Sequence, residues 1–184
     1  MKATRTAKAD DWKREDLPLN RTAIHLERRF SAEEMECIQR GCIPREMEDK
    51  WFIYWEKDTL FFHRSWTGHC VYVVRFRVDG EEFLMFEADL NRASEQYKAT
   101  SDEADAALIS YLVDSLLLRR PVDFPMDPSD PSGIAKAWSL VGRVLLGEYP
   151  EDDRGPVVFS KEVEDDAQPR ANSHRRARVV TCAV

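Results

Sequence analysis

The stretch from Lys50 to Leu90, KWFIYWEKDTLFFHRSWTGHCVYVVRFRVDGEEFLMFEADL, decides the fold of this chain. It holds six of the nine Phe and three of the five Trp, and its apolar side chains alternate with the period of a β-strand. Lys57-Asp58 and Asp79-Gly80 interrupt the alternation. Asp-Gly is a strong signal for a two-residue hairpin turn, which needs positive φ. The stretch therefore predicts a four-stranded antiparallel meander.

The two turns also set an expected register. With Lys57-Asp58 as the first turn, the cross-strand pairs are Trp51 and Arg64, Phe52 and His63, Ile53 and Phe62, Tyr54 and Phe61, Trp55 and Leu60. With Asp79-Gly80 as the second turn, Asp89 lies opposite Cys70. Both faces of the first two strands are apolar, so we expect cover on both sides of the sheet there.

Three helices are expected around this sheet. Ser31-Ala32-Glu33-Glu34 is a capping box, and the helix that it opens stops at Gly41. Thr100-Ser101-Asp102-Glu103 has similar capping chemistry before a long apolar stripe, and a last helix is expected over 132–146. The predicted fold is α+β: an antiparallel four-stranded meander packed by a short N-terminal helix and two C-terminal helices.

The apolar periodicity fades on both sides of this region. We therefore expect a disordered or loosely ordered N-terminal segment over 1–29, a single α+β domain over 30–147, and a disordered C-terminal tail over 148–184.

Composition narrows the function classes. The net charge is −7, and residues 31–147 carry 21 Asp and Glu against 13 Lys and Arg, so we expect no nucleic-acid partner. No run approaches the roughly 18 apolar residues of a membrane span, and no apolar leader is seen. The four Cys have no CxxC or Cys/His metal spacing. We expect a cytoplasmic protein with reduced thiols, no metal and no cofactor.

The bend HRSWTGH is the first candidate site. A guanidinium, two hydroxyls, two imidazoles and a Gly amide within seven residues can bind a small anion. The candidate ligand-binding residues are His63, Arg64, Ser65, Trp66, Thr67 and His69, with Glu87 as the nearby carboxylate. Strand alternation places Arg64 and Trp66 on the face opposite to His63, Ser65 and Thr67. The structural alternative is a hydrogen-bonded corner with Gly68 at positive φ and Trp66 in the core.

Two further arrangements carry chemistry in principle. Glu87 and Asp89 share a strand face, and such a pair does acid–base work if burial separates their pKa values. Cys70 near His63 or His69 suggests a thiol nucleophile, and a buried structural Cys is the alternative.

The run MEDKWFIYWEKDTLFFHRSWTGHCVYVVRF resembles a recurrent segment of small, uncharacterised bacterial proteins. The resemblance covers about residues 30–147, and such segments are associated with proteins that carry ADP-ribose-processing domains. None of the motifs of those enzymes is present here, so the resemblance transfers no catalytic residue, and the catalytic residues stay unknown.

The leading hypothesis is a cytoplasmic bacterial binding or accessory domain that recognises a small anionic ligand or a protein partner. One alternative is an enzyme acting on a nucleotide or ADP-ribose-like substrate, with His63, Arg64 and Glu87 around its site. Another is a structural or toxin–antitoxin-type interaction protein. A cleft that gathers His63, Arg64 and a carboxylate would favour the enzyme, whereas a buried Arg64 away from any cleft would favour the other two.

Overall fold

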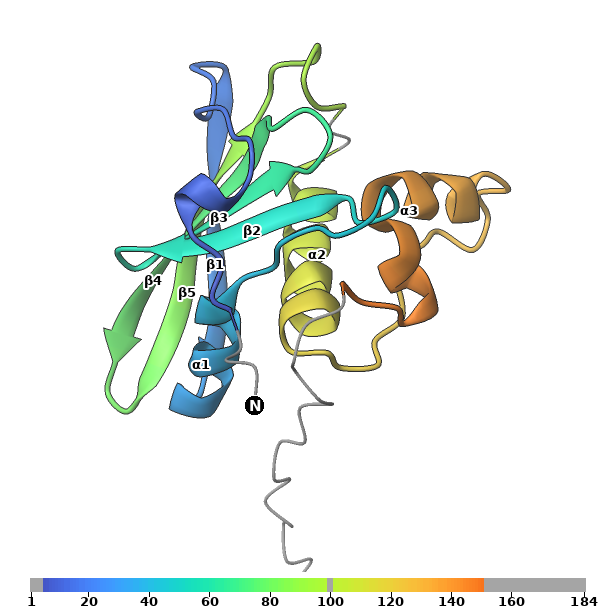
Figure 1. The fold of residues 1–184 in the computed structure, drawn as a ribbon. Coiled ribbons are helices and arrows are strands. Elements are labelled where there is room, and N and C mark those ends of the chain that lie inside the picture. The colour runs from blue at the N-terminus through green and yellow to red at the C-terminus, as the bar shows by residue number, and fades with distance from the viewer. Residues whose placement is uncertain (1–4, 99–100, 151–184) are drawn as a thin grey trace, which may run out of the picture.

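The computed structural model describes residues 5–98 and 101–150 (Figure 1). Its elements in chain order are the 3₁₀ turn η1 (Ala9–Asp11), β1 (Arg21–Phe30), α1 (Ala32–Arg40), β2 (Trp51–Glu56), β3 (Thr59–Arg64), β4 (Cys70–Asp79), β5 (Glu82–Asn91), α2 (Asp102–Leu112), the π-helical turn η2 (Val113–Leu117), α3 (Gly133–Val141) and the 3₁₀ turn η3 (Gly142–Leu146).

The α+β class and the antiparallel sheet are confirmed, but the prediction of four strands is wrong. Five antiparallel strands follow the order β1-β5-β4-β3-β2, and β1 pairs with β5 along its length. The segment 1–29 was expected to be loose, yet it contains η1 and most of β1. Strand β1 lies at the edge of the sheet and exposes alternate polar side chains, so only Leu26 and Phe30 of it are buried. Its apolar signal is therefore too weak to stand out in the sequence.

The register of the first hairpin is confirmed, while that of the second differs from the prediction. All five predicted pairs between β2 and β3 are present. Between β4 and β5, Asp79 pairs with Glu82, so Gly80 and Glu81 form the turn. Of these two turn residues only Gly80 has positive φ (68°), as a type II′ turn requires. A bulge between Arg75 and Phe76 then shifts the pairing again.

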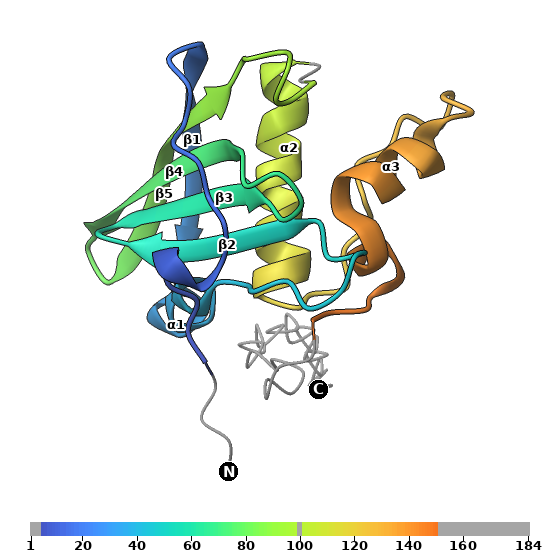
Figure 2. The same ribbon diagram turned by 45° about the horizontal axis from the view of Figure 1, so that its top comes forward.

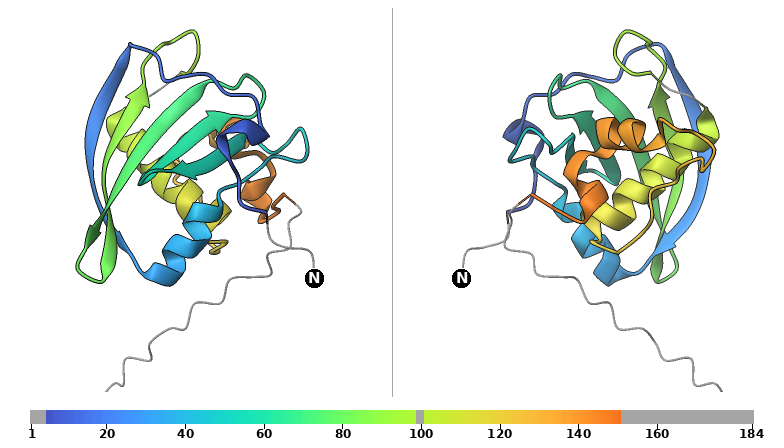
Figure 3. Two further views of the ribbon diagram at one scale, coloured as in Figure 1. Left: turned by 60° about the vertical axis from the view of Figure 1, so that its left-hand side comes forward. Right: turned by 90° about the vertical axis from the view of Figure 1, so that its right-hand side faces the viewer.

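The helices cover one face of the sheet, which we call the helical face; we call the other the open face. Figure 3 shows the open face in its left panel and the helices in front of the sheet in its right panel. The main core lies between the layers and includes Trp51, Phe62, Tyr72, Ile109 and Leu112. The caps predicted at Ser31 and Gly41 are present, and Ser31 accepts from the Glu34 amide. The expected last helix is broken into α3 and η3.

The N-terminal segment covers part of the open face (Figure 2). Ala7 is buried with Phe52 and Tyr54 in a second apolar cluster, against which Trp12 packs. The predicted cover on both faces of β2 and β3 is thus confirmed, and it comes from a segment that the sequence did not mark as ordered. Most of the predicted tail, residues 151–184, lies outside the described residues. Within the described ranges, no helix is long and apolar enough to cross a membrane.

Candidate functional site

The bend does not gather the side chains that its sequence brings together. Arg64 lies on the helical face, where its Nη1 donates to the Leu140 carbonyl (2.8 Å) and its Nη2 to the Ser139 carbonyl (2.9 Å). These carbonyls are at the C-terminal end of α3, where backbone acceptors lack helical partners and a cation is favoured. The fork of Arg64 is therefore occupied by the protein itself.

The remaining bend residues also hold the corner together. Ser65 is buried and its Oγ donates to the Asp49 carbonyl (2.6 Å), while Thr67 Oγ1 accepts from the His69 amide (3.3 Å). Gly68 has a φ of 86°, as the structural alternative of a hydrogen-bonded corner predicted. The same alternative also predicted that Trp66 lies in the core, and this prediction is wrong. Trp66 is 55% exposed and its indole N–H bonds the Met47 carbonyl.

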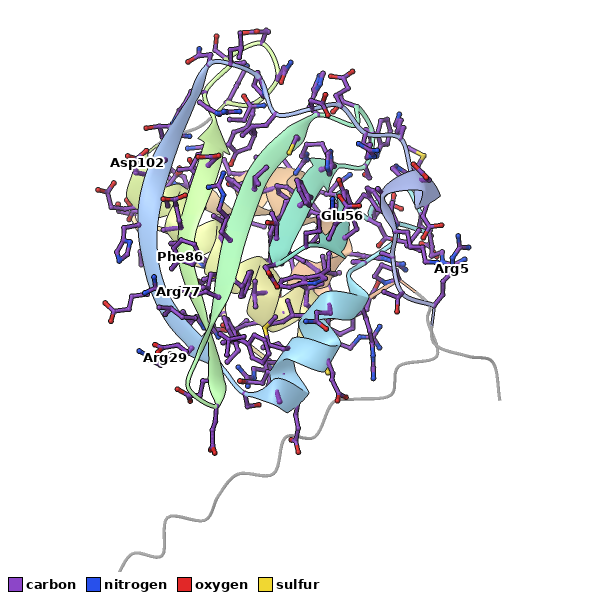
Figure 4. All side chains as sticks on the ribbon, turned by 90° about the vertical axis from the view of Figure 1, so that its left-hand side faces the viewer. Arg5, Arg29, Glu56, Arg77, Phe86 and Asp102 are labelled. Atoms are coloured by element: carbon purple, nitrogen blue, oxygen red, sulfur yellow. The ribbon has the colours of Figure 1, made fainter. Side chains whose placement is uncertain are left out.

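A pocket of about 400 Å³ opens on the other side of the sheet. We call it the open-face pocket. Figure 4 views this side, with Glu56 labelled where it projects from β2. The open-face pocket is lined by Arg14, Glu15, Asp16, Leu17, Arg21, Tyr54, Glu56, Phe61, His63, Cys70, Val73, Arg75 and Asp89. Of the predicted site residues only His63 lines this pocket, and Glu87 lies next to it.

His63 is the buried polar group of the pocket floor, with 2% of its surface exposed. Its Nδ1 lies 3.0 Å from the Gly68 carbonyl oxygen. Because a carbonyl only accepts, we assign the proton to Nδ1, which leaves Nε2 as an acceptor. Nε2 is buried and has no hydrogen-bond partner in the described structure. Burial lowers the pKa of His63 below its ordinary value of 6.5, so the imidazole is neutral at pH 7.

Aromatic rings surround this imidazole. Tyr54 stacks on His63 with ring centroids 5.7 Å apart and planes 16° apart, and it stacks on Phe61 at 4.9 Å and 8°. Burial raises the pKa of Tyr54 to about 12, so its hydroxyl is neutral. The floor therefore consists of a row of parallel aromatic rings without charge.

Cys70 pairs with His63 across β3 and β4. Its thiol contacts the Tyr72 carbonyl (3.8 Å), and burial raises its pKa to about 12. Because a thiolate is the nucleophilic form, this buried thiol is not activated. The geometry matches the structural alternative for Cys70.

Arg75 brings the two predicted carboxylates together on the pocket wall. It donates to Glu87 Oε1 and to Asp89 Oδ2, both at 2.6 Å. The bond to Asp89, followed by the charges of both carboxylates, outweighs burial and raises the pKa of Arg75. Glu87 and Asp89 do share a face, but they neutralise an arginine instead of forming a free acid–base pair.

The segment 12–20 forms the roof of the pocket, and we call it the strap. In its first half, the Glu15 amide bonds the Gly68 carbonyl (2.8 Å), and Glu15 Oε2 lies 2.6 Å from Nδ1 of His69. At the other end Asn20 exchanges two hydrogen bonds with the backbone of Arg92. The strap was missed because it contains few apolar residues, and Trp12 is the one local signal that could have indicated packing.

No group of three or more His, Cys, Asp or Glu side chains within 5–98 and 101–150 is placed to hold a metal ion. Comparisons of the chain with protein-family models, with curated proteins and with solved structures found no match.

Proposed function

We propose that this protein is a binding domain that holds a small polar molecule in the open-face pocket. The observation that carries the proposal is Nε2 of His63, a buried acceptor with no hydrogen-bond partner among the described residues, on a side chain that lines a cavity of about 400 Å³. A buried unsatisfied polar group costs about 1–3 kcal/mol, which a ligand that donates to it would recover in part. The volume also falls within the usual range for small-molecule pockets.

The position of Arg64 supports a binding domain over the proposed enzyme. The enzyme hypothesis needs His63, Arg64 and a carboxylate in one cleft. In the structure Arg64 bonds α3 on the helical face, and His63 lines a pocket on the open face. Glu87 is held by Arg75.

The charges of the pocket favour a ligand with both donors and acceptors. Three lining side chains are cationic and four are anionic; they are Arg14, Arg21, Arg75, Glu15, Asp16, Glu56 and Asp89. A strongly anionic ligand would meet about as much repulsion as attraction in such a ring. This modifies the expectation of an anionic ligand that the bend suggested.

One feature supports the enzyme alternative as a second candidate. A neutral imidazole with Nδ1–H on a carbonyl and Nε2 free has the form of a general base. Such a base would act on a nucleotide or ADP-ribose-like substrate only if that substrate brought its own reacting groups, because the Cys70 thiol is not activated.

A thermal-shift screen of the full chain tests the proposal. The panel contains nucleosides, nucleotides, ADP-ribose, phosphosugars and amino acids, and calorimetry measures the affinity of each hit. A ligand of the folded state raises the unfolding midpoint by mass action. We expect a hit whose shift is lost in His63→Phe and kept in Trp66→Ala, a change in the same bend but outside the pocket.

Two outcomes would contradict the proposal. A hit that is equally sensitive to Trp66→Ala and insensitive to His63→Phe would move the site to the bend. If the parent converts a hit into a product and the His63→Gln variant does not, the enzyme would be established instead.

A further inference from the structure

We propose that the ligand of the open-face pocket is a planar heteroaromatic molecule without net negative charge, whose ring N–H donates to Nε2 of His63. The proposal rests on the proposed function, because it names the class of ligand for the same pocket. Three properties of the described residues lead to it: the direction of one hydrogen bond, the shape of the floor and the balance of charge at the rim.

The hydrogen bond at Nδ1 determines what the other ring nitrogen can accept. Nδ1 donates to the Gly68 carbonyl, so Nε2 presents a lone pair. The two ring nitrogens point in roughly opposite directions. Nε2 therefore faces away from the bend, in a side chain that lines the pocket. A carboxylate or phosphate oxygen at this position would bring its own lone pairs against the lone pair of Nε2, which is repulsive. The ligand atom at this position must carry an N–H or O–H group.

The floor selects a flat molecule. The rings of Tyr54, Phe61 and His63 lie within 16° of parallel in each stacked pair and form a continuous row along β2 and β3. Val73 extends the row onto β4, opposite Phe61. A planar ring parallel to these can join the stack, and an aromatic N–H lies in the ring plane, where it can reach a neighbouring in-plane lone pair.

The rim disfavours polyanions. The guanidinium of Arg75 is already bonded to Glu87 and Asp89. Among the remaining rim groups, Asp16 and Glu56 have no ion pair in the described chain, and they offset Arg14 and Arg21. Arg14 and Asp16 both line the pocket, and their charges shift the pKa of His63 in opposite directions, Arg14 downward and Asp16 upward. A neutral or zwitterionic ligand fits this balance better than a phosphate chain.

The strap provides the route to the buried acceptor. Residues 16–19 make no hydrogen bond to the rest of the described chain, and Leu19 is 96% exposed. They span the distance between the anchors at Glu15 and Asn20. A segment held only at its ends opens at low cost, and its displacement would admit the ligand.

Matched probes test the inference on the full chain. Benzimidazole carries a ring N–H, and 1-methylbenzimidazole has the same ring without it. By calorimetry we expect the methylated probe to bind up to about tenfold more weakly, the effect of one lost hydrogen bond. In His63→Phe the two probes should bind equally, and in His63→Gln, which keeps an acceptor, part of the difference should remain. A comparison of the affinities of adenosine and adenosine 5′-diphosphate tests the effect of negative charge on the ligand, and we expect the diphosphate to bind more weakly.

The possible results separate this inference from the proposed function. If phosphosugars or carboxylates bind and lose affinity in His63→Phe, while the two benzimidazoles bind alike, the binding domain stands and the ligand class is wrong. If no compound of any class binds, both proposals fail. The ratio of the affinities of the two benzimidazoles for the parent protein can be measured even if His63→Phe does not fold. Equal affinities in the parent would overturn the inference.

Discussion

Arg64 and Trp51 meet at one carbonyl. The guanidinium carbon of Arg64 lies 4.9 Å from the centroid of the Trp51 ring, and both side chains donate to the oxygen of Leu140, each at 2.8 Å. The two residues are cross-strand partners on β2 and β3. This pair fastens the edge of the sheet to the end of α3, so its role in the described structure is architectural.

Arg64→Lys should therefore destabilise the protein with no ligand present. Lysine keeps the charge but loses the planar fork that reaches two carbonyls and stacks on Trp51. We expect a loss of about 1–3 kcal/mol in the free energy of unfolding, measured by chemical denaturation. Arg77→Lys is the matched control, because Arg77 lies over the Phe86 ring (5.1 Å; both are labelled in Figure 4) and is exposed. Equal stability of both variants would contradict the architectural role.

Gly80→Val should cost about 1 kcal/mol or more, because a β-branched residue resists positive φ. Gly80 has φ of 68°, and a Cβ at this position would meet no atom within 4 Å. The cost is then conformational and not steric crowding. Gly80→Asn should cost less, since Asn is accepted at such turn positions. Differential scanning calorimetry ranks the two variants by stability, and a smaller loss for Gly80→Val than for Gly80→Asn would refute the turn assignment.

Leu112→Ala and Val141→Ala should behave as core truncations. Leu112 is fully buried and Val141 is 2% exposed. We expect a loss of about 2–5 kcal/mol for Leu112 and less for Val141 in urea denaturation. Ile134→Ala is the control on α3, because Ile134 is 70% exposed, and its effect should stay within about 0.5 kcal/mol. Parent-like unfolding of both buried variants would show that the helices do not pack as described.

His63 should make the protein less stable in mild acid. Its pKa is lowered by burial, so below about 6.5 the unfolded chain takes up a proton that the folded protein resists. The free energy of unfolding should fall as the pH drops from about 7 to about 5, until the pH passes below the folded pKa. In His63→Phe this fall should be smaller. His25→Asn, at an exposed position on β1, is the control, and a parent-like slope in His63→Phe would contradict the buried neutral imidazole.

Only part of the candidate site could be predicted from the sequence. His63 was singled out, and its position opposite Phe52 was predicted correctly. The pocket around it could not be predicted, because its roof is the strap and its wall is Arg75 with its two carboxylates. A bulge at Phe86 in β5 sets Arg75 opposite Glu87. Asp89 was expected opposite Cys70 and instead pairs with Val73.

The features that the sequence determined by itself are local. Positive φ at Lys57 and Asp58 and the alternation on either side set the first hairpin, and Ser31 with Glu34 begins α1. These signals need only neighbouring residues, because turn geometry and capping bonds close within a few positions. Tertiary structure alone decided that β1 pairs with β5, that the strap crosses the open face, and that the guanidinium of Arg64 bonds the end of α3. An edge strand with a polar outer side and a polar strap carry little apolar pattern, so their order comes from distant backbone partners that no local stretch of the sequence encodes.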